Sequence, residues 1–206
     1  PKSPMNLAAK YLRIPNRVCV VTGANRGVGL ETARGLALKG NTVVLACRDE
    51  KLAKEAVEDI KSTRKVDPES VSYMPIDISS QASIRKFATA FSRKYRHLDV
   101  LVNNAAIAGP SKQQKSVDNL DIVFGTNVMG PFALTNQMLP FLNKSKAGRV
   151  VNVAANYVGA VDVEDLNFEK RLYNPLSAYK QSKQAVRMMS EVLHEYCKEN
   201  GSGIHV

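Results

Sequence analysis

Residues 18–29 read Val-Cys-Val-Val-Thr-Gly-Ala-Asn-Arg-Gly-Val-Gly and determine the fold that the sequence predicts. The opening apolar run is typical of a buried strand, and a helical pattern begins at Gly27. Gly23, Gly27 and Gly29 allow a tight turn, close approach of backbone to a phosphate, and close packing of helix on strand. The helix N-terminus then offers free N–H groups to a pyrophosphate. The stretch therefore predicts a dinucleotide-binding turn, with a plain strand-to-helix turn as the alternative.

Outside this stretch, short apolar runs alternate with longer amphipathic stretches, which predicts a parallel sheet built from βαβ units. Strands are expected at 18–21, 42–46, 71–76, 100–103 and 150–153, with a sixth beginning at 203–206. Helices are expected at 27–39, 50–62, 81–95 and 177–199, and a long helical region at 116–142 is interrupted near Gly130-Pro131. Right-handed crossovers give the order 3-2-1-4-5-6 of a Rossmann-type doubly wound α/β fold.

The length of 206 residues suits one α/β domain. Residues 1–16 are short, mixed and flanked by proline, so we expect an N-terminal arm there and a single domain at 17–206. No apolar run reaches the roughly 18 residues that a transmembrane helix needs. Three widely spaced cysteines suggest free thiols in a reducing compartment and no metal site. An intracellular protein is expected, either cytoplasmic or peripheral to an internal membrane.

The formal net charge of +10 raises the question of nucleic-acid binding. Many of the cations follow or end two expected helices, where they complement the negative end of a helix dipole. They are Lys61, Arg64, Lys65, Arg93, Lys94 and Arg96. No nucleic-acid motif and no interleaved aromatic residues accompany them. We therefore expect no nucleic-acid partner, whereas weak association with a membrane surface stays open.

The second expected strand ends in Ala46-Cys47-Arg48, where a fold that prefers NAD usually places an acid to hold the ribose 2′-hydroxyl. This chain has Cys47 at that position, then Arg48, with Arg26 inside the glycine turn. Two guanidinium groups at one corner suit a 2′-phosphate, because arginine offers a planar, bidentate fork. The sequence therefore favours NADP(H), and the alternative is a solvated Arg48 that pairs with Asp49.

Further motifs accompany the glycine turn: Asn103-Asn104-Ala105-Ala106, Asn127, and Tyr179-x-x-x-Lys183. Together they resemble the short-chain dehydrogenase/reductase family over essentially the whole of 16–206. Three details are similar to its retinol-dehydrogenase-like branch: Leu45-Ala46-Cys47-Arg48-Asp49, Arg149-Val150-Val151-Asn152-Val153, and Asp165-Leu166 before the tyrosine. The resemblance implies an NADP(H)-dependent oxidoreductase that interconverts the alcohol and carbonyl of an apolar small molecule, such as a retinoid, steroid or lipid aldehyde. It also implies a homo-oligomer.

The resemblance assigns cofactor contacts as well. It implies that Asp77 and Ile78 line the adenine pocket, and that Asn103, Ala105 and neighbouring backbone hold the cofactor across the sheet. The expected contacts in the glycine turn and after the second strand are Gly23, Asn25, Arg26, Gly27, Val28, Gly29 and Arg48. The fourth-strand motif of the family usually ends in glycine. This chain has Ala106 there, a small departure that we expect to be tolerated.

Tyr179 and Lys183 lie four residues apart on an expected helix, so their side chains share a face. A close cation favours the ionised form of a tyrosine, whose pKa is otherwise about 10. The resemblance implies that Tyr179 exchanges a proton with the substrate oxygen and that Lys183 also grips the nicotinamide ribose. It implies that Asn127 bends its helix and holds a water for a proton relay. The alternatives are a surface Tyr-Lys pair, and a kink or capping role for Asn127.

The fifth expected strand departs from the family pattern. It usually ends in Val-Ser-Ser, and the second serine donates a hydrogen bond to the reacting oxygen. This chain reads Val153-Ala154-Ala155, so the missing donor maps onto Ala155. Losing one such donor typically slows the reaction by ~10²–10³. Asn156 offers an amide, but a shift of one residue at a strand end aims it differently.

Two functions follow, and the sequence leaves both open. The first is the NADP(H)-dependent oxidoreductase, favoured by Asn127, Tyr179 and Lys183. The second is a non-catalytic NADP(H)-binding protein that acts as a sensor or interaction protein, favoured by Ala155. The substitution could be engineered, natural or part of a variant site. Compared with the family pattern, the seventh strand and the substrate lid are absent, so the expected domain is C-terminally truncated.

Overall fold

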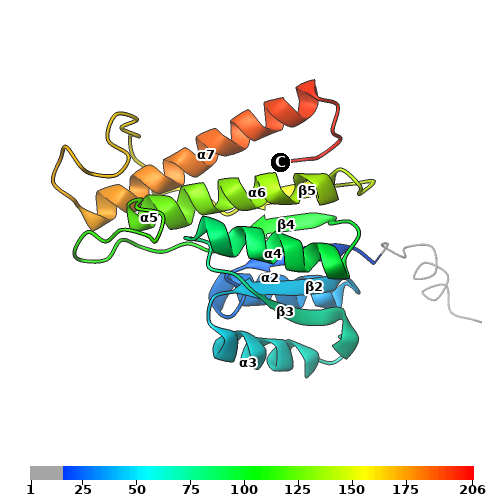
Figure 1. Cartoon of the computed structure of the whole chain (residues 1–206). Helices are drawn as coiled ribbons and strands as arrows, with labels where there is room; N and C mark the ends of the chain where they lie inside the picture. The colour runs from blue at the N-terminus through cyan, green and yellow to red at the C-terminus, as the bar shows by residue number, and fades with distance from the viewer. Residues whose placement is uncertain (1–15) are drawn as a thin grey trace, which may run out of the picture.

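Five apolar runs form one parallel sheet in the computed structural model, which describes residues 16–206 (Figure 1). The strands are β1 (Val18–Thr22), β2 (Thr42–Cys47), β3 (Val71–Pro75), β4 (Val100–Asn103) and β5 (Arg149–Asn152). Their order, β3-β2-β1-β4-β5, confirms the first five positions of the predicted order. Because β1 and β2 are covered on both faces, their sequences are continuous apolar runs rather than alternating patterns.

Helices connect the strands and begin where local capping residues stand. They are α2 (Gly27–Leu38), α3 (Glu50–Lys61), α4 (Gln81–Lys94), α5 (Ile122–Phe124), α6 (Gly130–Leu142) and α7 (Pro175–Glu199), with the 3₁₀-helix η1 (Pro68–Ser70) and the π-helix η2 (Gly125–Met129). The side chains of Asp49, Ser80 and Asn174 accept hydrogen bonds from first-turn N–H groups of α3, α4 and α7. Such caps satisfy backbone donors that have no partner within the helix.

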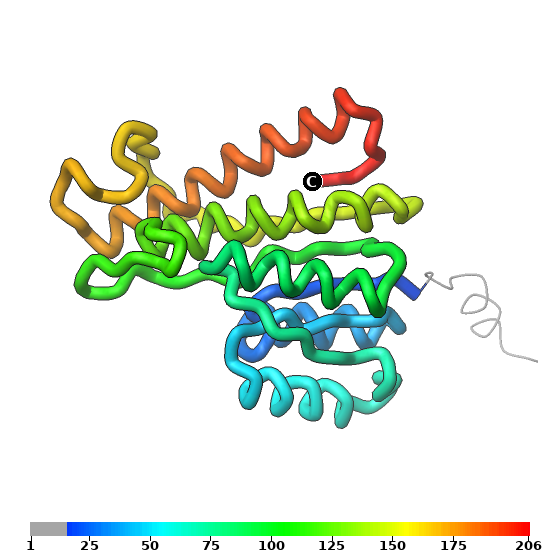
Figure 2. Tube along the Cα trace, viewed as in Figure 1, coloured from blue at the N-terminus to red at the C-terminus, as the bar shows by residue number. Residues whose placement is uncertain are grey.

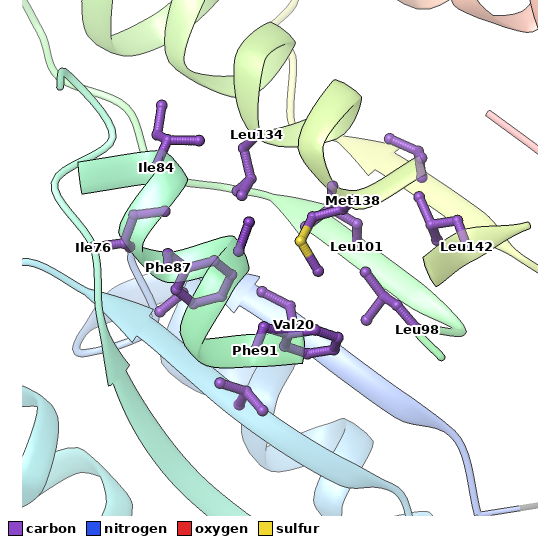
Figure 3. Packing of buried hydrophobic residues seen from close by; sticks show 14 of the residues in the cluster. Val20, Ile76, Ile84, Phe87, Phe91, Leu98, Leu101, Leu134, Met138 and Leu142 are labelled. Carbon is purple, nitrogen blue, oxygen red and sulfur yellow. The ribbon is translucent and has the colours of Figure 1, made fainter. Parts of the chain in front are cut away.

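Helices cover both faces of the sheet, because successive strand residues point to opposite sides. Val20 of β1 packs with α4, α6 and α7, whereas Val21 packs with α2 and α3 (Figure 1). Figure 3 shows the first of these two cores from close by, with Phe87 and Phe91 of α4 facing Met138 of α6. The sheet is thus held rigidly between two helical layers.

The predicted sixth strand is wrong for the described chain. His205 makes one isolated parallel bridge to Arg149, with hydrogen bonds from Val150 N to His205 O (2.8 Å) and from His205 N to Gly148 O (3.0 Å). Gly203 has φ +66°, so the extended backbone begins only after it. One bridge is too short to form a strand, and the sheet has five strands instead of six.

The long helical region predicted at 116–142 begins later than expected. Ser116 holds a turn rather than a helix start, since its Oγ accepts hydrogen bonds from Asp118 N and Leu120 N. Asp121 caps α5 through Val123 N and Phe124 N. The interruption predicted near Gly130-Pro131 is present as the π-helix η2, which ends where α6 begins.

The strands all run towards the end of the molecule that lies on the left in Figure 1. The loops at 104–121 and 153–174 gather at this carboxyl edge, beside the start of α7 (Figure 2). No helix within 16–206 combines the length and apolarity of a membrane span. The predicted N-terminal arm lies outside the described residues except for Asn16, whose Oδ1 accepts a hydrogen bond from Thr42 N (2.9 Å).

Candidate functional site

The glycine turn joins β1 to α2 at the carboxyl edge of the sheet. Gly23 and Gly27 adopt φ +64° and +56°, which side chains with a Cβ rarely tolerate. A Cβ on Gly29 would lie 2.5 Å from both Gly23 O and Asn104 Nδ2, and one on Gly23 would lie 3.0 Å from Ala105 Cα. The turn, the helix and the end of β4 are therefore packed closer than any side chain would allow.

This turn exposes the N-terminus of α2. Arg26 occupies the N-cap position without a side-chain hydrogen bond, and no acid stands in the first turn. Arg26, Gly27 and Val28 are exposed, and Asn25 is half-buried. The leading N–H groups of α2 are thus available to an anion, which the helix dipole also favours.

Thr22 and Asn104 hold the turn against β4, and sequence reasoning missed both roles. Thr22 Oγ1 accepts hydrogen bonds from Asn104 N (3.0 Å) and Ala105 N (2.9 Å) and donates one to Val102 O (3.3 Å). Asn104 Nδ2 donates to Thr22 O (2.9 Å). No local sequence signal identifies these bonds, because each spans about eighty residues of chain.

The end of β2 places Cys47 and Arg48 beside the glycine turn. Arg48 is exposed, and no ion pair joins it to Asp49 among the described residues. Asp49 instead caps α3 through Leu52 N (2.9 Å). Cys47 is buried, and this burial raises the pKa of its thiol to about 11. The corner therefore carries a neutral thiol and a cation, with no carboxylate at the position that would repel a phosphate.

The segment after β3 forms a second wall of this edge. Asp77 Oδ1 accepts hydrogen bonds from Ser79 N (2.9 Å) and Ser79 Oγ (2.6 Å), so its carboxylate shapes a turn. Ile78 is buried against the start of α6. A Cβ on Gly130 would overlap the carbonyl oxygen of Ile78, so this glycine permits the contact.

Asn103 lies inside the molecule rather than at its edge. Its Nδ2 donates to Thr135 Oγ1 (3.0 Å) and to Asn152 Oδ1 (2.8 Å), and Asn152 Nδ2 donates to Ser190 Oγ (2.9 Å). The amide thus joins β4, β5, α6 and α7 through buried polar contacts. Ala105, two residues further on, is half-buried beside Gly23 of the glycine turn.

Asn127 sits in the π-helix and is almost fully buried. Its Oδ1 accepts a hydrogen bond from Ile107 N (2.8 Å), and its Nδ2 donates to Ile107 O (2.9 Å) and to Ser182 Oγ (2.9 Å). Ser182 Oγ in turn donates to Tyr179 O (2.7 Å). Asn127 therefore links the loop after β4 to the turn of α7 that carries Tyr179. A π-helix often marks a functional site.

Lys183 and Tyr179 lie on the same face of α7, as predicted. The Lys183 Nζ is 5.9 Å from the centroid of the Tyr179 ring and donates a hydrogen bond to Val153 O (2.7 Å). Lys183 is only 4% exposed, and no ion pair is found for it within 16–206. Burial lowers the pKa of its ammonium. A buried cation without an acid is costly, and it commonly has a functional reason.

Ala155 is half-buried just beyond β5, and its methyl group offers no hydrogen bond. Asn156 and Tyr157 are exposed, and the Lys180 Nζ lies 4.0 Å from the centroid of the Tyr157 ring. The side-chain amide of Asn156 makes no hydrogen bond to a described residue. The structure therefore places no evident substitute for the serine hydroxyl at this strand end.

The two loops of the carboxyl edge are bonded to each other. Gln113 Nε2 donates to Asn167 O (2.6 Å), and the Lys115 Nζ lies 3.1 Å from Glu169 Oε1. Below them, Phe168 packs with Val123 and Ala178 in a small separate core. Ala178 precedes Tyr179, so this core supports the first turns of α7 beside the candidate site.

Most of the predicted site residues therefore share one edge of the sheet. The glycine turn, Arg48 and the segment at 77–78 surround the starts of α2 and α3. Asn127 is linked to the backbone of Tyr179 through Ser182, and Lys183 donates to Val153 O at the end of β5. Crevices at this edge of α/β sheets are common ligand sites. The arrangement can hold a phosphate-bearing ligand at one end and present a phenol and an ammonium at the other.

Comparison with known proteins agrees with this geometry. A family model described as short chain dehydrogenase matches residues 17–206. Retinol dehydrogenase 13 of Mus musculus is 37% identical over 195 residues, which cover 94% of this chain and 57% of that protein. Polyprenol dehydrogenase of Mus musculus is 37% identical over 196 residues, which cover 92% and 57%. The chain thus spans less than two thirds of the length of these relatives.

Solved structures are also similar. An uncharacterised protein from Mycobacterium Paratuberculosis has a TM-score of 0.79 and 36% identity, covering 92% of this chain and 67% of that one. The Pseudomonas aeruginosa RhlG/NADP active-site complex has a TM-score of 0.73 and 27% identity, covering 94% and 71%. Both likenesses extend over nearly all of the described residues.

Proposed function

This chain belongs to the short-chain dehydrogenase family, and we propose that it is an NADP(H)-dependent oxidoreductase that interconverts an alcohol and a carbonyl. The observation that carries the proposal is the placement of Lys183, which is buried beside Tyr179 and has no ion pair with any residue that the structure describes. A structural role alone does not require an ammonium there. The alternative of a surface Tyr-Lys pair does not describe a lysine that is 4% exposed.

The residues at the carboxyl edge fit a nicotinamide dinucleotide phosphate. The close backbone at Gly23 and Gly29 and the uncapped start of α2 suit a pyrophosphate. Arg48 and Arg26 are exposed and would hold the 2′-phosphate, while the neutral Cys47 adds no repulsion. The bound cofactor would supply the hydride. The NADP complex of the similar RhlG protein supports this choice of cofactor.

The chain's own residues would handle the proton. Tyr179 would direct its phenolic hydroxyl at the substrate oxygen, giving a proton during carbonyl reduction and taking one during alcohol oxidation. Lys183 has three N–H donors, so it would bind the nicotinamide ribose with those that Val153 O does not use. Asn127 would keep the π-helix and the start of α7 in register, so that Tyr179 is held in place.

An apolar substrate is supported by the side chains of the two loops. Val117, Val163 and Leu172 are 81%, 66% and 95% exposed, and all three lie on loops of the carboxyl edge. Such side chains are available to pack against an apolar ligand at this edge. The names of the retinol and polyprenol dehydrogenases that resemble this chain point to the same class of retinoid or other lipid substrate.

Ala155 favours a second candidate, a non-catalytic NADP(H)-binding protein. Without the serine hydroxyl, one donor to the developing oxyanion is lost, which typically costs ~10²–10³ in rate. The glycine turn and Arg48 do not depend on this donor. Cofactor binding would therefore survive in either case, and turnover separates the two candidates.

The deciding experiment compares NADPH oxidation by this chain and by Ala155→Ser with a panel of apolar aldehydes. We expect the serine to raise kcat by about 10²–10³ while NADPH affinity stays the same. Ala154→Ser is the matched control, because it adds the same hydroxyl one residue away, on an exposed side chain. If all three proteins bind NADPH and none turns over any aldehyde, the enzyme is excluded and the binding protein is supported.

A further inference from the structure

The amino edge of the sheet, opposite the candidate site, carries a concentration of exposed cations. The segments that lead into β2, β3, β4 and β5 are 39–41, 62–70, 95–99 and 143–148, and together they form what we call the amino-edge surface. Its exposed lysines and arginines are Lys39, Arg64, Lys65, Arg96, Lys144 and Lys146. None of these six forms an ion pair among the described residues. Arg93, Lys94 and Arg149 border the same surface and are exposed as well.

Acidic residues are few on the amino-edge surface. The only acids in its segments are Asp67, Glu69 and Asp99. Asp99 is half-buried and accepts a hydrogen bond from Val18 N (2.7 Å), and Asp67 accepts one from Glu69 N (3.0 Å). The loops at 104–121 and 153–174 of the carboxyl edge, in contrast, hold six acids and four cations. The positive charge of the chain is therefore concentrated at one end.

Helix dipoles explain only part of this pattern. The C-terminal ends of α2, α4 and α6 favour a nearby cation, but the effect falls off within about one turn. It does not account for Arg149, which begins β5, or for Lys146, which stands nearer to that strand than to the end of α6. The helix-dipole effect also does not explain why the six exposed cations of this surface have no acidic partner among the described residues.

We propose that the amino-edge surface docks this protein onto an anionic lipid membrane. Each lysine or arginine that approaches such a surface strengthens binding by about fivefold, without any specific pocket. Leu38 is 44% exposed beside Lys39, so an apolar side chain accompanies the cations, as suits a lipid interface. Docking by this edge leaves the carboxyl edge, with the candidate site, facing the water. The proposal does not depend on catalytic activity.

A membrane fits this surface better than a nucleic acid does. Proteins commonly bind nucleic-acid phosphates through backbone N–H groups and helix N-termini as well as side chains. Here the helices α2, α4 and α6 end at the surface, so they offer no helix N-terminus that could bind a nucleic-acid phosphate closely. Binding therefore depends on the flexible charged ends of the lysine and arginine side chains, and these suit the evenly distributed negative charge of an anionic membrane surface.

Vesicle flotation of the full chain tests the proposal. We expect binding to vesicles of mixed phosphatidylserine and phosphatidylcholine, little binding to phosphatidylcholine alone, and loss of binding at high ionic strength. The double variant Lys144→Gln/Lys146→Gln should bind the anionic vesicles at least about tenfold more weakly. Lys112→Gln/Lys170→Gln removes the same charge from exposed residues of the opposite edge and should bind like the unaltered chain.

Two results would overturn the inference. Equal weakening by both double variants would show that net charge, and not the amino-edge surface, attracts the vesicles. Displacement of the protein from anionic vesicles by duplex DNA at equal phosphate concentration would indicate a nucleic-acid surface instead. Thermal unfolding of each variant checks that a loss of binding does not come from a loss of fold.

Discussion

The ammonium of Lys183 donates a hydrogen bond to the backbone carbonyl of Val153, 2.7 Å away, just beyond the end of β5 at one side of the sheet. Val153 N in turn donates to Asn103 O (3.0 Å), so the lysine is joined to β4 through the backbone of this one residue. This single bond offsets only part of the cost of burying the charge. The contribution of Lys183 to the free energy of unfolding therefore depends on pH.

The first prediction concerns this pH dependence. The pKa of Lys183 is lowered from 10.5 by burial, so the unfolded chain binds more protons than the folded chain as the pH approaches 10.5. Folding stability contributed by this group therefore rises with pH in that window. We expect the free energy of unfolding of the unaltered chain to rise relative to that of Lys183→Met between neutral pH and 10.5. Urea unfolding at several pH values measures the difference.

Lys180→Met is the control for this series, because Lys180 lies on the same helix with its ammonium over the Tyr157 ring. The free energy of unfolding of Lys180→Met, relative to that of the unaltered chain, should vary less with pH. The free energy of unfolding of the unaltered chain, relative to that of Lys183→Met, could instead stay constant or fall between neutral pH and 10.5. That result would contradict a Lys183 whose pKa is lowered by burial.

The strands were the most predictable part of the fold. The runs at Val18 and Thr42 are buried on both faces, and burial by itself selects β-branched and apolar residues there. Their order follows from short right-handed connections. The sixth strand was wrong because pairing needs several residues in register, and Gly203 interrupts the extended backbone. The hydrophobic pattern of the four residues 203–206 does not show whether they pair with a neighbouring strand.

Helix starts were harder to predict, because several residues near one position are able to cap. Ser116 and Asp121 are both good N-cap residues. Contact between loops decides between them: Asn167 Oδ1 accepts a hydrogen bond from Asp121 N (2.9 Å), forty-six residues away in the chain. No local pattern contains that contact, so the expected start at 116 came too early.

The candidate site was predictable to the extent that its residues share local motifs. Tyr179 and Lys183 follow from helical spacing, and the glycine turn from its flanking strand and helix. The supporting contacts of Thr22 and Ser182 were missed, since a lone hydroxyl residue has many possible partners. The roles of the predicted residues in binding and catalysis stay predictions until they are measured.

The glycine turn gives a second prediction. In Gly29→Ala, the added Cβ meets backbone and amide atoms at 2.5 Å, and the neighbouring turn is too constrained to move far. We expect a loss of about 1–3 kcal/mol in the free energy of unfolding, as for other overpacked sites, and weaker NADPH binding. Chemical denaturation and fluorescence titration measure the two effects.

Gly35→Ala is the matched control on the same helix, because a Cβ there meets nothing within 4 Å. Alanine favours the interior of a helix by about 0.5–1 kcal/mol over glycine, so this variant should be more stable and bind NADPH unchanged. Similar stability for both variants would show that the close packing at Gly29 has little energetic weight.

A third prediction concerns the choice of cofactor. Arg48→Gln removes an exposed guanidinium beside the neutral Cys47 thiol. Hydrogen bonds to a charged group are worth about 1.5–3 kcal/mol, so NADPH affinity should fall by about tenfold to a hundredfold while NADH affinity changes little. Isothermal titration with both cofactors measures the ratio. Arg64→Gln, an exposed arginine at the opposite edge, should leave both affinities as they are. Equal affinity of the unaltered chain for the two cofactors would refute the NADP(H) assignment.

The last prediction concerns the loop that precedes α7. Arg171 lies 3.4 Å from Asp165 Oδ2, donates to Gln181 Oε1, and stacks 4.1 Å from the centroid of the Phe168 ring. Gln181 stands between Tyr179 and Lys183 on α7, so Arg171 fastens the loop to the turn that carries both. Arg171→Gln loses charge-assisted bonds worth about 1–2 kcal/mol, and amide hydrogen exchange at 162–173 should accelerate by about tenfold.

Lys170→Gln is the control for this loop, because the neighbouring lysine is exposed and its side chain makes no ion pair with a described residue. Exchange in the loop should then stay as slow as in the unaltered chain. If the substrate surface is the one formed by this loop, Arg171→Gln should also raise the KM for an aldehyde more than it lowers kcat, because Tyr179 stays linked to Asn127 through Ser182. Unchanged exchange in Arg171→Gln would mean that the small core around Phe168 holds the loop without the arginine.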